Sequence, residues 1–110
     1  MRRRKDIQTR AHHRLEVWQR GMALAKSVYE TTQSFPKHER YSLTGQMRRS
    51  ALSVPSNIAE GAARETPAEL LRFLHFARGS LAELETQAML AEEIGYLNDD
   101  GTLLRQLNDV

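Results

Sequence analysis

Apolar residues recur along most of this chain at spacings of three and four, which is the period of an amphipathic α-helix. The clearest case lies within residues 67–94, where one row repeats at four-three intervals: Leu70, Leu74, Ala77, Leu81, Leu84, Ala88 and Ala91. Such a repeat predicts a helix that packs lengthwise on antiparallel neighbours. No segment alternates apolar and polar residues as a half-buried strand does, so the sequence predicts an all-α fold.

Two further helices are expected before this one. The first spans about 15–34 and ends before a proline, and the second spans about 39–62, restarts at a Ser42 cap and closes at Gly61. Pro55 lies inside the second helix and removes one backbone hydrogen bond. Because the apolar row keeps its phase across Pro55, we expect a kinked helix rather than two helices.

Cap residues indicate where the last two helices begin. Thr66-Pro67-Ala68-Glu69 has the pattern of a capping box, with proline at the first position of the helix over 67–94. The fourth helix is expected to begin near residue 99, with Asn98 or Asp99 as its cap. It is either short or truncated, in which case the chain continues past Val110.

The sequence therefore predicts an antiparallel up-and-down four-helix bundle over residues 15–110, preceded by a basic flexible arm over 1–14. The apolar arc of the first helix is wider than one neighbour needs, and some apolar residues of the third lie off its main row. We therefore expect the bundle to assemble as a ring. The expected interface residues are Val17, Leu24, Val28, Phe76, Leu90 and Ile94.

The charge is concentrated in the arm. The formal net charge is +2, yet residues 1–14 carry six basic groups against one acidic group. Two interpretations stay open: a solubilising tail, or an arm that binds nucleic acid. For the second, the expected contact residues are Arg2, Arg3, Arg4, Lys5, Arg10, Arg14, Arg48, Arg49 and Arg64.

Composition excludes several classes of protein. There is no cysteine, so the chain has neither a disulfide framework nor a thiolate metal site. No run of about 18 apolar residues could span a bilayer, and no apolar region follows the basic start as in a signal peptide. The four histidines are not spaced with carboxylates as metal ligands. We therefore expect a cytoplasmic protein that is not an enzyme and holds no cofactor.

A polar row runs along the second helix beside its apolar row. Its members repeat at four-three intervals: Gln46, Ser50, Ser53, Asn57 and Glu60. One interpretation is a hydrogen-bonded network between helices. The expected donors to Glu60, Glu83 or Glu85 are Arg48, Arg49, Arg64 and Arg72. The other interpretation is a groove for nucleic acid, or a small-ligand pocket around Asn57 and Glu60.

The segment Gln46 to Gly61, QMRRSALSVPSNIAEG, has the form of a family signature, with Leu15-Glu-Val-Trp18 before it and Ala77-Arg-Gly-Ser-Leu81 after it. On these residues the chain resembles the bacterial four-helix-bundle proteins encoded in 23S ribosomal RNA intervening sequences. The accessory variability determinant of diversity-generating retroelements is similar. The signature positions are Gln46, Arg49, Ser53, Asn57, Glu60 and Gly61.

The resemblance implies a homopentameric ring without an established enzyme activity. It also implies a role with nucleic acid, because the retroelement relatives are positively charged barrels that work with a reverse transcriptase. Residues 15–110 carry ten basic and 13 acidic groups, so only the arm, repeated around a ring, supplies a basic surface. We therefore expect a self-assembling scaffold or adaptor. The alternatives are an accessory factor that binds RNA or DNA and partners a reverse transcriptase or another protein, and a small-ligand sensor.

Overall fold

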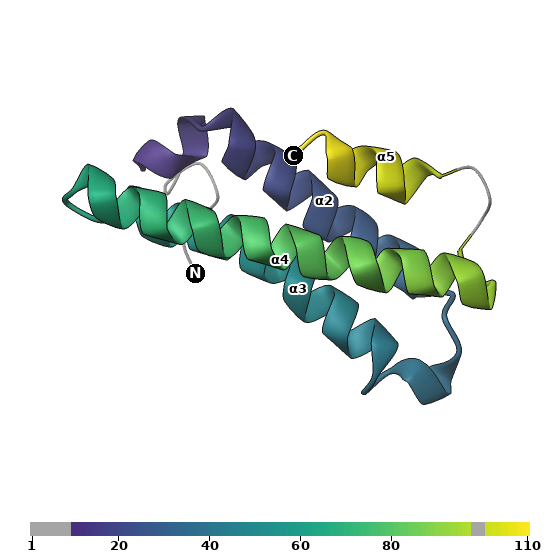
Figure 1. The fold of residues 1–110 in the computed structure, drawn as a ribbon. Helices are drawn as coiled ribbons and strands as arrows, with labels where there is room; N and C mark the ends of the chain where they lie inside the picture. Colours follow the sequence, from purple (N-terminus) through teal and green to yellow (C-terminus); the bar gives the residue numbers. More distant parts are fainter. Residues whose placement is uncertain (1–9, 98–100) are drawn as a thin grey trace, which may run out of the picture.

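In the described part of the chain, four α-helices are arranged around a common core (Figure 1). The computed structural model describes residues 10–97 and 101–110, and the regular structure in these ranges is entirely helical. The helices are α2 (Glu16–Thr32), α3 (Leu43–Ala62), α4 (Pro67–Ile94) and α5 (Thr102–Asn108), with 3-10 helices η1 (Ala11–Arg14) and η2 (Lys37–Glu39). The helix α3 packs against both α2 and α4, and α5 packs against the same two helices. Within the described ranges, no helix is both long enough and apolar enough to cross a bilayer.

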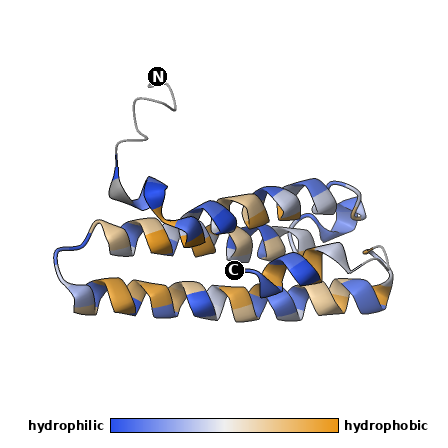
Figure 2. Ribbon diagram, turned by 90° about the horizontal axis from the view of Figure 1, so that it is seen from above, coloured by the Kyte–Doolittle hydropathy of each residue, from blue (hydrophilic) through white to orange (hydrophobic). Residues whose placement is uncertain are grey.

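Local capping explains the bounds of α4, which match the predicted range. The hydroxyl oxygen of Thr66 accepts a hydrogen bond from the Glu69 N–H at 3.2 Å, and Pro67 occupies the first turn. At the other end Gly95 adopts a left-handed conformation with φ of 94°, which only glycine adopts at no steric cost. Hydrophobic residues recur along the whole length of α4 (Figure 2).

The start of α3 is capped differently from the prediction. Ser42 precedes the helix as expected, but its hydroxyl donates to Glu39 Oε1 at 2.6 Å and makes no bond to the first turn of α3. Glu39 Oε1 also accepts the Leu43 N–H at 3.4 Å, so the glutamate of η2 supplies the cap. As predicted, the helix continues through Pro55 without a break.

Gly61 has a different role from the one predicted. It lies in the last turn of α3, which ends at Ala62, so it does not close the helix. A Cβ atom at Gly61 would lie 2.8 Å from Cβ of Phe73 and 3.3 Å from the carbonyl oxygen of Leu70. The absence of a side chain therefore lets α3 and α4 approach closely at their connection.

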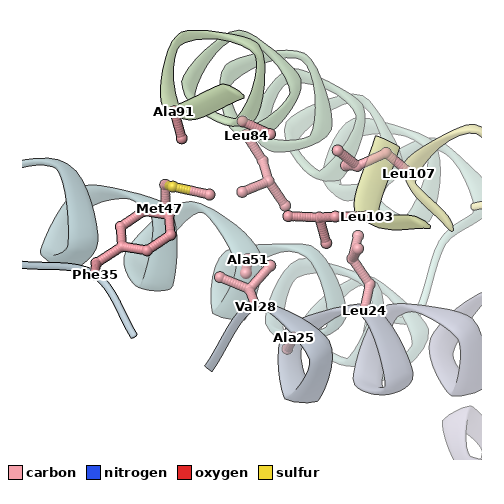
Figure 3. Close-up of a cluster of buried hydrophobic side chains, with 11 residues drawn as sticks. Leu24, Ala25, Val28, Phe35, Met47, Ala51, Leu84, Ala91, Leu103 and Leu107 are labelled. Carbon is pink, nitrogen blue, oxygen red and sulfur yellow. The ribbon is translucent and has the colours of Figure 1, made fainter. Parts of the chain in front are cut away.

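The larger core cluster joins all four α-helices (Figure 3). Leu24 and Val28 of α2 are 0 % exposed, and they pack with Met47 of α3 and Leu84 of α4. Leu24 and Val28 were predicted to lie at an interface between subunits. Because the chain buries both completely, that assignment is wrong.

Among the described residues, the other half of the bundle has no fourth helix beside it. Figures 1 and 2 show α5 next to the C-terminal half of α4 only. In the remaining half, Val54 and Ile58 are covered by half-buried side chains, including Trp18 and Leu74. The fourth helix begins at Thr102, after Gly101 with φ of 67°, and not near residue 99. The predicted caps Asn98 and Asp99 lie outside the described residues.

The end of the predicted arm is folded onto the bundle. Residues 11–14 form η1, which packs on α2 and α3. The rings of His12 and His13 lie 5.1 and 4.8 Å from the Trp18 ring. Burial, assisted by the nearby charges of His13 and Arg10, lowers the pKa of His12. The predicted boundary at residue 15 is therefore too late.

Candidate interaction surfaces

Three polar residues of α3 make hydrogen bonds beside the core. The Ser50 hydroxyl donates to Glu83 Oε2 of α4 at 3.1 Å, and the hydroxyls of Ser53 and Ser80 are hydrogen-bonded to each other. The Asn57 side-chain amide donates to the Ser53 carbonyl oxygen at 2.8 Å. Bonds between two helices at successive turns favour one longitudinal register of α3 on α4.

The arginines predicted to join this polar row differ in their partners. Arg48 turns toward α2, where Nε donates to Thr32 Oγ1 at 2.9 Å and the guanidinium lies 4.8 Å from the centre of the Tyr29 ring. Arg64 reaches Glu60 at 3.5 Å, but both residues are exposed and lie one turn apart. The predicted pairing of Arg64 with Glu60 is therefore confirmed, whereas Arg48 bonds to α2 and not to any of the predicted glutamates.

A shallow groove follows the polar row between α3 and α4. Its lining is Gln46, Arg49, Ser50, Ser53, Ser80 and Glu83. The lining does not include Asn57 or Glu60, around which the sequence predicted a small-ligand pocket. In the folded chain Asn57 bonds to its own helix and Glu60 pairs with Arg64, so both side chains are engaged elsewhere.

Exposed apolar residues border this groove on α4, and we name the surface the α3–α4 face. It consists of the groove together with Phe76, Leu90 and Ile94, which are 46–49 % exposed. Phe76, Glu83 and Leu90 are spaced by seven residues, which places them on one side of the helix. The face therefore has an acidic residue between two apolar ones.

A second surface lies on the opposite side of α3, and we name it the α2–α3 face. Leu15, Met22 and Tyr29 also follow one another at intervals of seven, and each is more than one-third exposed. Leu52 of α3 is 50 % exposed and lies one turn after Arg48, which contacts Tyr29. The seven-residue spacing can be read in the sequence, but it overlaps with the apolar row of α2 that forms the core, which includes Leu24 and Val28.

Val17 belongs to neither face. Its side chain is 38 % exposed. At the angular step of an α-helix it lies about 140° around α2 from Met22. Val17 was predicted as an interface residue together with Leu24 and Val28; it is exposed, but the row of Met22 and Tyr29 lies on another side of α2.

Basic and aromatic side chains meet where α3 connects to α4. The guanidinium groups of Arg64 and Arg72 lie 4.9 and 5.4 Å from the centres of the Phe73 and Phe76 rings, respectively. The two phenylalanine rings are 5.5 Å apart and nearly perpendicular. Figure 1 places η1 at the same end of the molecule.

The other predicted nucleic-acid contacts are distributed unevenly. Arg10 and Arg14 are exposed at the end of the molecule that carries η1. Arg49 is exposed beside the groove, away from that end, and Arg48 is held against α2. The remaining residues lie outside the described part of the chain: Arg2, Arg3, Arg4 and Lys5.

A half-buried hydrogen bond connects η2 to the segment that follows α4. The Tyr96 hydroxyl donates to Glu39 Oε2 at 2.9 Å, and the Tyr96 ring lies 5.3 Å from the ring of Phe35. The hydrogen bonds from Ser42 and then from Tyr96 lower the pKa of Glu39. The same bond to Glu39 raises the pKa of Tyr96. No local sequence pattern indicates this contact, which spans 57 positions.

Within the described ranges, no group of three or more histidines and carboxylates is placed to hold a metal ion.

The family of the protein follows from the comparison of its sequence with known families. Among curated proteins, none matches the chain closely enough to count as a relative. A family model described as 23S rRNA-intervening sequence protein matches residues 13–109. Because this match spans nearly all of the helical bundle described above, the chain belongs to the 23S rRNA-intervening sequence protein family.

Proposed function

We propose that this protein is a non-enzymatic scaffold or adaptor that assembles with copies of itself into a homopentameric ring in the bacterial cytoplasm. Each subunit is an antiparallel up-and-down bundle. The connection between α3 and α4 spans residues 63–66, and a turn this short between helices that pack on each other favours an antiparallel pair.

One observation carries the proposal: the chain exposes two rows of apolar side chains besides its buried core. Phe76, Leu90 and Ile94 lie on α4, while Met22 and Tyr29 lie on α2. Apolar side chains that repeat along one side of a helix are typical of a surface that another helix covers. Burying them removes apolar area from water, which favours association.

Light scattering at micromolar concentration tests the assembly. We expect a mass close to five subunits for the wild-type chain. Leu90→Glu places a charge on the α3–α4 face and should reduce the assembly, because burying an unpaired carboxylate is costly. Leu71→Glu is the matched control, since Leu71 is 55 % exposed on the same helix but lies about 140° around it from Phe76. A monomeric wild-type chain at all concentrations would refute the proposal.

A second candidate function is binding of structured RNA or DNA as an accessory factor, with a reverse transcriptase or another protein as partner. The observation that favours it is the cluster at the α3–α4 connection, where Arg64 and Arg72 lie over Phe73 and Phe76. Arginine beside an exposed aromatic ring, here Phe76, suits contacts with phosphates and unstacked bases. Arg10 and Arg14 add positive charge at the same end.

The test is RNA binding by the Arg10→Gln/Arg14→Gln/Arg64→Gln variant across a series of salt concentrations. A plot of log affinity against log salt concentration falls with a negative slope, and each lost phosphate contact should make this slope shallower by about 0.7–0.9. Lys37→Gln is the control, because Lys37 is an exposed basic residue of η2 beyond the opposite end of α2. Equal affinities for the triple variant and the wild-type chain would argue against this function.

A further inference from the structure

We infer that the α2–α3 face of one copy binds the α3–α4 face of the next copy, so that the subunits join head to tail around α3. This inference rests on the proposed self-assembly and names the surfaces that meet. Each face carries apolar residues at seven-residue spacing, namely Leu15, Met22 and Tyr29 on one, and Phe76 with Leu90 on the other. Such rows can pack together as the sides of neighbouring helices do.

The α2–α3 face carries Arg48 and the α3–α4 face carries Glu83, and neither has an ionic partner among the described residues. Arg48 lies between Tyr29 and Leu52 on the α2–α3 face, and no carboxylate of the described residues lies within 4.0 Å of it. Glu83 lies between Phe76 and Leu90, and within the same ranges it receives a bond from the Ser50 hydroxyl but no ion pair. Pairing unlike faces lets Arg48 approach Glu83, whereas pairing the α2–α3 face with itself brings two Arg48 side chains together.

The placement of the faces favours a closed ring. They flank α3 on adjacent sides of the bundle, and adjacent sides of a four-helix bundle point about 90° apart. Rings of four and five copies need contact surfaces whose outward directions differ by about 90° and about 108°, respectively. Repeated head-to-tail contacts therefore close the subunits into a ring, with α3 toward the axis and α5 on the outside.

Two blocked variants test the pairing. Met22→Glu blocks the α2–α3 face and Leu90→Glu blocks the α3–α4 face, and both residues are exposed, so the fold should survive, as circular dichroism can verify. Each variant alone should be monomeric by light scattering. An equimolar mixture should form a one-to-one dimer and nothing larger, because each variant still offers the face that the other lacks.

The outcomes separate this inference from the proposed self-assembly. If Met22→Glu alone still forms dimers, the α3–α4 face pairs with itself and the head-to-tail contact is wrong. A mixture that stays monomeric while the wild-type chain assembles also overturns the inference. If the wild-type chain is itself monomeric, the self-assembly fails and this pairing fails with it. Leu71→Glu should assemble like the wild-type chain in every case.

Discussion

At the scale of single residues, two buried glycines at helix contacts differ in what an added methyl group would meet. At Gly61 a Cβ would lie 2.8 Å from Cβ of Phe73, a contact that requires the backbones to shift. At Gly21 it would meet Cγ1 of Val54 at 3.4 Å, which is ordinary contact. Gly61→Ala should therefore destabilise the fold by about 1–3 kcal/mol. Gly21→Ala should stabilise it by about 0.5–1 kcal/mol through its higher helix propensity.

Urea denaturation of the two variants measures this difference. The midpoint should fall for Gly61→Ala and rise for Gly21→Ala, with unchanged slopes. Midpoints that fall equally for both would show that the approach of α3 to α4 is no tighter than that of α2 to α3.

The sequence could show which residues are apolar but not always where each one points. Leu24 and Val28 were assigned to an interface because the apolar arc of α2 is wide. The arc is wide because α2 touches α3 on one side and α5 on another, and it also carries the exposed row of Met22 and Tyr29. In the sequence, residues that face different neighbours all appear as apolar positions of one helix. Only the packed structure shows which neighbour each residue faces.

At the scale of elements, local chemistry decided which helix ends could be predicted. The bounds of α4 follow from Thr66, Pro67 and Gly95, whose effects act within one turn. The start of α3 depends instead on Glu39, which bonds to Ser42 and to the distant Tyr96. The start of α5 follows Gly101 in a left-handed conformation, which its sequence neighbours did not indicate.

The hydrogen bonds of Glu39 make stability depend on pH. They hold the pKa of Glu39 below the ordinary value of 4.5, so the fold favours the carboxylate form. That contribution is fully present above about pH 4.5 and is lost as the pH falls through the lower folded-state pKa. Glu39→Gln should therefore be less stable than the wild-type chain at neutral pH, and the difference should shrink in acid.

Thermal unfolding between about pH 7 and about pH 3 measures this difference. Tyr96→Phe should show a smaller effect of the same sign, because it removes one of the bonds to Glu39 and keeps the ring against Phe35. Glu93→Gln, an exposed change on α4, is the control and should leave the profile unchanged. If Glu39→Gln is less stable than the wild-type chain by the same amount at every pH, the Glu39 carboxylate is not the cause of the pH dependence.

At the scale of the whole molecule, the short α5 leaves half of the bundle with three helices, and both outer faces of α3 carry exposed apolar residues. A chain that hides part of its apolar surface only by association should gain stability from its neighbours. By mass action, binding at 100 times the dissociation constant stabilises the folded state by about 2.7 kcal/mol. The melting temperature of the wild-type chain should therefore rise with protein concentration.

Calorimetry over a hundredfold or so range of concentration measures this rise, with the affinity setting its size. The melting temperature of Leu90→Glu should not change with concentration, because its α3–α4 face cannot be covered. Leu71→Glu should follow the wild-type chain, because its charge lies on a different side of α4. A wild-type melting temperature that does not change with concentration would mean that the exposed rows stay in water, and that the chain is stable without its copies.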